Sequence, residues 1–302
     1  MSVIVAVAPA NILCQNLARM PELPEVETIK LGLQKELVNH AIMAVEVRVP
    51  KLFAGNPAVL KGQKVLEIAR RAKILIIKLT NSYLIIHLKM TGQLIFVPNI
   101  GEDWVVGGHP DKAYTADLPH KHTHIIFTFD NGRLYFNDLR KFGWVKLLDE
   151  EAELEPYLTD LGVEYTWPEY TLDYFTRKLA RRKSITIKQA LLDQSLVAGV
   201  GNIYADESLF CARISPLRKV SSLTPKEIAK LYDCIPQVFT LSLEHGGTSS
   251  QHYRRHDGSK GKFLEIANVY KREGLPCKVC GTPIERVKIS GRSSHYCPHC
   301  QK

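Results

Sequence analysis

The sequence has no apolar run long enough to cross a membrane. Of its 302 residues, 45% are hydrophobic and 24% are charged, and none of the apolar runs reaches the roughly 18 residues that a transmembrane helix requires. The apolar segment 1–19 contains Pro9 and has no basic stretch at its start, so it is not typical of a secretory signal peptide. These absences predict a soluble globular protein, and its length suggests two domains.

Cysteine is scarce as well. The chain has seven cysteines, and four of them lie in the last 26 residues. Disulfide scaffolds distribute more cysteines over a shorter chain. The sequence therefore predicts no disulfide framework and favours a reducing compartment.

Acidic residues are outnumbered by basic ones. The chain has 31 Asp and Glu against 40 Lys and Arg, a net charge of +9. Segment 177–188, "RKLARRKSITIK", has six basic residues and no acid. An excess of positive charge favours polyanionic partners, above all nucleic acid. Charge alone leaves open a second interpretation, a basic face that contacts only solvent.

The spacing of apolar residues divides the chain into a β-rich part and a helical part. A helix is predicted from Glu22, with Val26, Ile29, Leu33 and Leu37 on one side. Alternating segments at 42–49, 64–79, 82–96, 123–138 and 143–148 then predict a β-sandwich. After the acidic stretch 149–156, a candidate hinge, helices are predicted near 171–181, 187–194, 202–211 and 225–244. Residues 244–263 are rich in Gly, Ser and His and predict a long mobile loop.

Four cysteines near the carboxyl end have a spacing typical of zinc sites. Cys277 and Cys280 form one C-x2-C pair, Cys297 and Cys300 form a second, and 16 residues separate the pairs. Two such pairs can place four thiolates at the corners of a tetrahedron. Because four thiolates fill the coordination sphere, the predicted zinc ion is structural. His299 lies inside the second pair and is a less suitable fourth ligand.

The segment between the two cysteine pairs predicts a β-hairpin. Its sequence, "GTPIERVKISGRSSHY", places Gly291 in a turn between two strands and Arg292 at the tip. An arginine at such a tip can reach a phosphate or a groove of DNA. An arginine that contacts only solvent would fit the same pattern.

Six motifs occur together in this chain, and they carry a resemblance to one enzyme family. They are "PELPEVET", "RRAKILII", "HLKMTGQL", "DLRKFG", "LLDQSLVAGVGNIYADESLF" and the terminal C-x2-C pairs. In this order they resemble the bacterial formamidopyrimidine-DNA glycosylases, relatives of endonuclease VIII, from Pro21 to Lys302. The opening "PELPEVE" favours the branch that acts on oxidised purines. The resemblance implies a bifunctional DNA glycosylase and AP lyase of base excision repair.

The resemblance implies four catalytic residues. In the family the mature protein begins at the proline, here Pro21, whose secondary amine attacks C1′ of the damaged nucleotide and forms an imine. An internal proline has only an amide nitrogen, so Met20 is interpreted as the true start and residues 1–19 as an extension absent from the mature protein. Glu22 would protonate the sugar ring oxygen, Lys73 would serve β-elimination, and Arg292 would serve δ-elimination. Lys73 is predicted to lie on a strand and to project into a cleft.

The resemblance also implies residues that contact DNA. Met90 and Phe142 would fill the gap left by an extruded base, and Arg140 would bind the orphaned cytosine. Phosphate contacts are implied for four further residues: His122, Lys183, Lys188 and Asn202. The glycines at 199 and 201 allow a tight link between two helices, whose amides are predicted to receive a phosphate.

His120, His122 and His124 are predicted to alternate on one strand face. Such a face invites a metal site, but the stretch has no carboxylate partner, so the phosphate contact of His122 is preferred.

Together these observations predict an α+β protein. An N-terminal β-sandwich domain flanked by helices (20–150) precedes a helical domain with a helix-two-turn-helix motif (151–265) and a β-hairpin zinc finger (266–302). The expected cofactor is one structural zinc ion. The protein is expected to be a monomer in the bacterial cytoplasm and nucleoid. Its expected partner is damaged double-stranded DNA, and no membrane association is expected. Two alternatives stay open: an endonuclease VIII-like preference for oxidised pyrimidines, and a catalytically silent binder of damaged DNA if the extension blocks Pro21.

Overall fold

The computed structural model describes residues 21–101, 104–108, 118–248 and 262–302. The extension, Met20 and most of the predicted loop at 244–263 therefore lie outside the described residues. In the part that is described, no helix is long and apolar enough to span a membrane.

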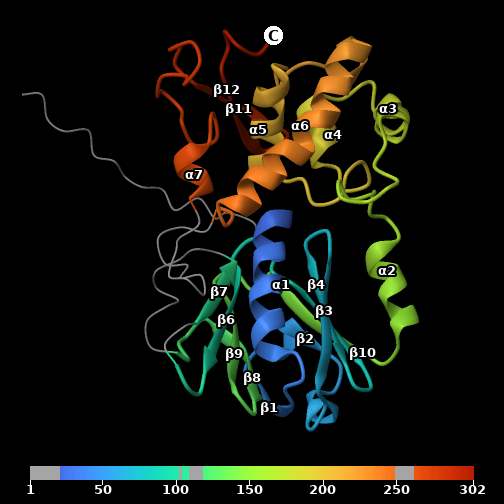
Figure 1. The fold of residues 1–302 in the computed structure, drawn as a ribbon, viewed down its shortest axis with the longest axis vertical. Helices are drawn as coiled ribbons and strands as arrows, with labels where there is room; N and C mark the ends of the chain where they lie inside the picture. Colours follow the sequence, from blue (N-terminus) through green and yellow to red (C-terminus); the bar gives the residue numbers. More distant parts are fainter. Residues whose placement is uncertain (1–20, 102–103, 109–117, 249–261) are drawn as a thin grey trace, which may run out of the picture.

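The first helix, α1 (Leu23–Leu37), connects two hydrophobic cores. Its first residue, Leu23, packs in the core of the helical domain. The predicted face Val26, Ile29, Leu33 and Leu37 packs in the core of the β-sandwich. Figure 1 shows this helix alongside the strands of the β-rich lower part, with its upper end reaching the helical upper part. Residues at its amino end are therefore held at the junction of the two domains.

Within the described residues, ten strands form the predicted β-sandwich. They are β1 (Ile42–Val47), β2 (Phe53–Ala54), β3 (Val65–Arg71), β4 (Ile74–Leu79), β5 (Tyr83–His87), β6 (Gly92–Pro98), β7 (Val105–Gly108), β8 (Thr123–Phe129), β9 (Gly132–Asp138) and β10 (Trp144–Leu148). One sheet has the order β1-β8-β9-β6-β7 and the other β2-β10-β5-β4-β3. Two short 3-10 helices, η1 (Pro50–Leu52) and η2 (Pro57–Leu60), lie between β1 and β3. The predicted turn at 130–132 joins the antiparallel strands β8 and β9.

The acidic stretch 149–156 folds into two short helices, η4 (Glu151–Leu154) and α2 (Glu155–Leu158). Leu154 is buried in a small cluster with Ile74, Ile76 and Ile85 of the second sheet. The hinge proposed for this stretch concerns motion and stays a prediction.

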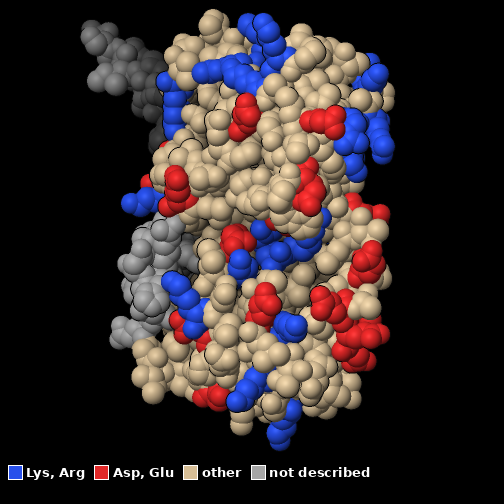
Figure 2. Space-filling view, turned by 45° about the vertical axis from the view of Figure 1, so that its right-hand side comes forward, with Lys and Arg blue, Asp and Glu red and all other residues tan. Residues whose placement is uncertain are grey.

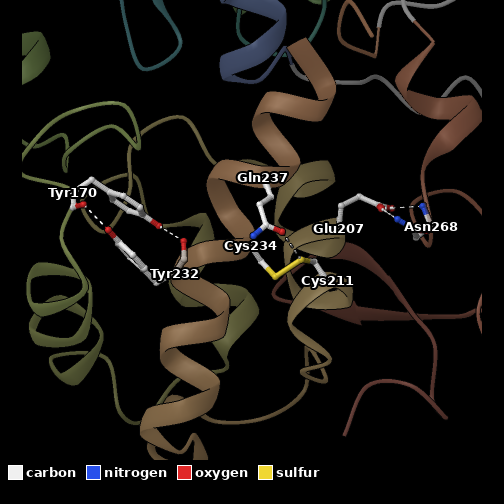
Figure 3. Close-up of a disulfide and its surroundings, with 7 residues drawn as sticks. All are labelled: Tyr170, Glu207, Cys211, Tyr232, Cys234, Gln237 and Asn268. Atoms are coloured by element: carbon white, nitrogen blue, oxygen red, sulfur yellow. Dashed lines mark hydrogen bonds between the residues drawn. A yellow bond between two sulfur atoms is a disulfide. The ribbon is translucent and has the colours of Figure 1, made fainter. Parts of the chain in front are cut away.

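The helical domain contains the four predicted helices. They are α3 (Leu172–Ala180), α4 (Ile187–Leu192), α5 (Asn202–Ala212) and α6 (Pro225–Glu244), with η5 (Val220–Ser222) before α6 and α7 (Phe263–Ile266) after it. Figure 3 shows a disulfide between Cys211 of α5 and Cys234 of α6. The scarcity of cysteine did not predict this bond, because the two residues are 23 positions apart and meet only when the helices pack.

The zinc-finger segment forms the predicted hairpin of β11 (Glu285–Ile289) and β12 (Arg292–Tyr296). Its turn has positive φ angles at Ser290 (46°) and Gly291 (78°), and glycine adopts such an angle without steric cost. The architecture confirms the predicted α+β class.

Candidate active site and DNA interface

The Glu22 carboxylate is held at the amino end of helix α5. One oxygen, Oε1, accepts a hydrogen bond from the Ile203 amide at 2.9 Å, and Oε2 accepts one from the Tyr204 amide at 3.4 Å. The Glu22 amide donates to Oε2 of Glu25 at 2.9 Å, which completes the capping box of α1. Glu22 is only 2% exposed.

Gly201 makes this approach possible. A Cβ at position 201 would lie 2.2 Å from Cδ of Glu22, far inside contact distance. The predicted glycine link is present, but the α5 amides of Ile203 and Tyr204 receive the carboxylate of Glu22. The prediction that they receive a DNA phosphate is wrong for these two amides.

Lys73 lies in the turn between β3 and β4, which corrects its predicted place on a strand. The chain reverses there because Ala72 adopts a left-handed conformation with φ 52°. The side chain is buried, and Nζ donates to the carbonyl oxygen of Val200 at 3.0 Å. Lys73 therefore reaches from the sandwich domain to the loop before α5. Its predicted projection into a cleft stays a prediction.

Glu22 and Lys73 influence each other's protonation. Burial raises the pKa of Glu22 to about 7, although the charge of Lys73 opposes this shift. Burial lowers the pKa of Lys73 to about 8, against the attraction of Glu22 and with a contribution from Arg292. An acid and an amine whose pKa values lie this close to neutrality are suited to proton transfer.

Pro21 and Arg292 lie at the same site. Pro21 is buried and directly precedes Glu22. Arg292 is exposed at the start of β12, and its charge contributes to lowering the pKa of Lys73. The four predicted catalytic residues thus come from the two residues directly before α1, the β3–β4 turn and the zinc hairpin.

Met90, Arg140 and Phe142 form a second group. The Arg140 guanidinium donates to Sδ of Met90 at 3.3 Å and lies 4.7 Å from the centre of the Phe142 ring. The Phe142 side chain is 53% exposed, and the Arg140 amide is fixed by the Thr91 hydroxyl at 3.0 Å. Two separate loops therefore present an apolar surface and a cation side by side.

The three histidines do not share a strand face, which corrects the predicted alternation. His120 and His122 precede β8, and the His122 amide donates to Nδ1 of His120 at 3.1 Å. His124 is buried in β8, and its Nε2 donates to the Asp138 carbonyl oxygen at 2.7 Å. Among the described residues, the three histidines are not one of the groups whose ligand atoms lie close enough together to hold a metal ion.

The predicted phosphate-binding residues of the helical domain differ in exposure. Lys183 is exposed before α4. Lys188 is completely buried, and its Nζ contacts Oδ1 of Asp206 at 2.6 Å and the Asn202 carbonyl oxygen at 2.8 Å. A phosphate cannot reach an amine with no exposed surface, so the predicted contact of Lys188 is wrong for this conformation. Asn202 donates through Nδ2 to the Ser293 carbonyl oxygen at 2.8 Å and so joins α5 to the zinc hairpin.

The four predicted zinc ligands meet. The Sγ atoms of Cys277, Cys280, Cys297 and Cys300 lie within 4.8 Å of one another, and two pairs are 4.0 and 3.5 Å apart. Zinc–sulfur bonds of about 2.3 Å in a tetrahedron need sulfur atoms roughly 3.8 Å apart. The thiolates therefore fit one zinc ion, and no other potential metal cluster occurs within the described ranges.

Two buried acids, Glu25 and Glu207, connect the site to distant segments; the sequence suggested a first-turn or supporting role for Glu25 and none for Glu207. Glu25 accepts from the Tyr204 hydroxyl at 2.7 Å and the Thr248 amide at 2.9 Å. Glu207 accepts from the Asn268 amide at 2.9 Å and so holds the chain before the zinc finger (Figure 3). These contacts join residues more than 60 positions apart, and no local sequence pattern signals them.

Known proteins share the sequence and the fold. Residues 20–145 match the formamidopyrimidine-DNA glycosylase N-terminal domain, residues 161–254 its H2TH domain, and residues 274–302 the zinc finger found in FPG and IleRS. The chain is 42% identical to the formamidopyrimidine-DNA glycosylase of Herpetosiphon aurantiacus over 294 residues, which cover 93% of this chain and 100% of the relative. For the Listeria innocua relative the identity is 39%, with 94% and 100% covered.

Solved structures agree with this relationship. The crystal structure of MutM (Fpg) from Thermus thermophilus is 38% identical, has a TM-score of 0.79, and the match covers 93% of this chain and 98% of that one. The complex of Lactococcus lactis Fpg with a Fapy-dG containing DNA is 33% identical, with a TM-score of 0.80 and coverage of 93% and 100%. This chain belongs to the formamidopyrimidine-DNA glycosylase family.

Proposed function

We propose that this protein is a bifunctional DNA glycosylase and AP lyase that excises oxidised purines, including formamidopyrimidines and 8-oxoguanine, from double-stranded DNA. The observation that carries this proposal is the buried Glu22 carboxyl, whose pKa of about 7 leaves about half of it protonated at neutral pH beside Pro21 and Lys73. The family membership and the binding of Fapy-dG DNA by the Lactococcus lactis relative support the same lesion class.

The reaction begins at Pro21 once its nitrogen is a terminal amine. The nitrogen lone pair attacks C1′ of the damaged nucleotide, and the base leaves with the electrons of its glycosidic bond. The Pro21 nitrogen gives up its N–H proton, which neutralises the departing base. Glu22 then gives its proton to the ring oxygen of the sugar, the bond between C1′ and that oxygen breaks, and the nitrogen lone pair forms an iminium (protonated-imine) bond to C1′. Loss of a proton from C2′ then breaks the 3′ carbon–oxygen bond, a step assigned to Lys73. The second elimination breaks the 5′ bond and is assigned to Arg292.

The amine requirement sets the start of the active chain. An α-amine has a pKa near 8, about two units below that of a lysine side chain, so a larger fraction is neutral at pH 7. The match to the family's N-terminal domain begins at residue 20. This supports an active form that begins at Pro21 and lacks residues 1–19. We assign the remaining chain to domains 20–150, 151–265 and 266–302.

The group of Met90, Arg140 and Phe142 is assigned to the gap in the base stack. The exposed Phe142 ring is suited to fill the position that the extruded base leaves. The Arg140 guanidinium beside it is suited to donate hydrogen bonds to the unpaired cytosine. His122, Lys183 and Asn202 are assigned to the DNA backbone, and a monomer in the bacterial cytoplasm and nucleoid is the expected working state.

A lesion panel tests the proposal. Protein beginning at Pro21 is incubated with duplexes that contain 8-oxoguanine, a formamidopyrimidine or an oxidised pyrimidine, and the excised base and the strand ends are measured. We expect both purine lesions to be excised with β,δ-elimination products. Preferential excision of the pyrimidine would establish the endonuclease VIII-like alternative. Binding of all three duplexes without excision would establish the silent binder.

A further inference from the structure

The β3–β4 turn that carries Lys73 is tied to the helical domain by a buried acid, Glu164. This residue lies between α2 and α3 and is 2% exposed. Its Oε2 contacts Nη2 of Arg70 at 2.8 Å, and its Oε1 contacts Nη1 of Arg71 at 3.2 Å. At the level of this junction, Figure 2 shows basic and acidic side chains close together.

Glu164 also contacts the backbone of the turn itself. Its Oε1 accepts the Ala72 amide at 2.6 Å, and Arg70 donates to the Ala72 carbonyl oxygen at 3.0 Å. Ala72 has a left-handed φ of 52°, a conformation that is sterically unfavourable for a residue with a Cβ. The two bonds on either side of Ala72 hold it in this unfavourable conformation.

The conformation of Ala72 determines where the next residue points. Lys73 enters the junction and donates to the Val200 carbonyl oxygen of the loop before α5. The turn is therefore fixed twice by the helical domain, by Glu164 at its backbone and by Val200 at the tip of Lys73. A change of the Ala72 dihedral angles would move the amine away from Glu22.

We propose that Glu164 is a positioning residue that fixes the Lys73 amine in the active site through its hydrogen bond to the Ala72 amide. The proposal rests on the proposed function, in which Lys73 serves β-elimination. It assigns to Glu164 an effect on the elimination step, beyond a contribution to domain contact.

A competing role for Glu164 is to hold the two domains together by charge. Arg71 also donates to the carbonyl oxygens of Gly162 at 2.6 Å and Leu161 at 3.2 Å, and its guanidinium lies 4.2 Å from the Trp167 ring centre. If charge pairing is what matters, removing the charge of Glu164 will be more harmful than shortening its side chain.

Two reciprocal variants separate these roles. Glu164→Gln keeps an oxygen within reach of the Ala72 amide and loses the charge. Glu164→Asp keeps the charge and withdraws the carboxylate by one methylene from that amide. Arg71→Met is the matched control, because it loosens the same interdomain cluster and leaves the bond between Glu164 and Ala72 intact.

Each variant, in the form that begins at Pro21, is measured on duplexes with a preformed abasic site. Borohydride trapping reports imine formation by Pro21, and the single-turnover rate of strand cleavage reports elimination, each from pH 6 to 10. Zinc content and the thermal unfolding midpoint show that the variants are folded.

Positioning through Ala72 predicts that Glu164→Asp loses cleavage rate by on the order of 10²-fold, the cost of misplacing a catalytic group by about 1 Å. Its trapping changes less, and its cleavage profile moves to higher pH as Lys73 leaves its buried site. Glu164→Gln and Arg71→Met keep the wild-type pH profile. A larger loss of cleavage rate in Glu164→Gln than in Glu164→Asp would overturn the proposal. Equal losses of trapping and cleavage in Glu164→Asp, with an unchanged pH profile of cleavage, would also overturn it. A wild-type protein that neither traps nor cleaves would instead refute the proposed function.

Discussion

The carboxylate of Glu22 accepts the backbone amide of Ile203 at 2.9 Å, across 181 positions of the sequence. The amino end of a helix stabilises a negative charge, and this effect alone would lower the pKa of Glu22. Burial and the neighbouring Glu25 act in the opposite direction, and burial is the largest contribution, so the pKa rises to about 7. The site therefore holds an acid that hydrogen bonds orient and that burial keeps mostly protonated below about pH 7.

The first prediction concerns pH. Because the folded-state pKa of Glu22 is raised above the ordinary 4.5 to about 7, the proton is present below that pH and is lost above it. Excision in single turnover should fall as pH rises through this range, and it should fall on the acidic side as the Pro21 amine becomes protonated. Glu22→Gln should lose excision across the range. A wild-type rate that stays level from pH 6 to 9 would contradict the acid role.

The second prediction concerns Gly201. Gly201→Ala would place a methyl group 2.2 Å from the Glu22 carboxyl carbon, so the acid must leave its position. We expect excision to fall on the order of 10²-fold. Gly62→Ala is the matched control, because its Cβ meets nothing within 4 Å, although its φ of 85° costs some stability. Equal excision by the two variants would show that the placement of Glu22 is not critical.

Local patterns predicted the elements of this fold well. The spacing of Val26, Ile29, Leu33 and Leu37 predicted the buried face of α1 because helix periodicity is a property of neighbouring residues. The spacing of the four cysteines likewise predicted the zinc site, since each pair lies on one short turn.

Contacts between distant segments were not predictable in the same way. A buried lysine and a solvent-exposed one look alike in sequence, and only the packing of α4 on α5 shows that Lys188 pairs with Asp206. A left-handed φ angle is usually signalled by a glycine, and position 72 is an alanine, so nothing in the sequence indicated the turn. Lys73 was therefore predicted to lie on a strand. The disulfide of Cys211 and Cys234 depends on the packing of α5 against α6.

The third prediction concerns the zinc ion. The purified protein should contain one zinc per chain, and Cys297→Ala should lose it, because three thiolates hold the ion less firmly than four. Cys297 is buried against Phe210 and Ile284, so its loss should unfold the finger and weaken DNA binding. Metal analysis and fluorescence anisotropy with a duplex are the measurements. A variant without zinc that binds DNA normally would refute this role.

The fourth prediction concerns Arg292. Arg292→Ala should weaken DNA binding and reduce the slope of log K against log salt by about 0.9, the effect of one lost phosphate contact. The variant should still be trapped on an abasic site at saturating concentration, while its products shift from δ toward β ends. Unchanged salt dependence together with unchanged product ends would make Arg292 an arginine that contacts only solvent.

The measurement that tests the account most directly compares two starts of the chain. Intact mass defines one protein that begins at Pro21 and one that retains Met1, and both are incubated with borohydride and a duplex containing 8-oxoguanine. The account predicts a covalent adduct, at one chain per lesion, for the form that begins at Pro21 and none for the form that begins at Met1, whose proline nitrogen is an amide. Equal trapping of both forms would contradict the assignment of Pro21 as the nucleophile.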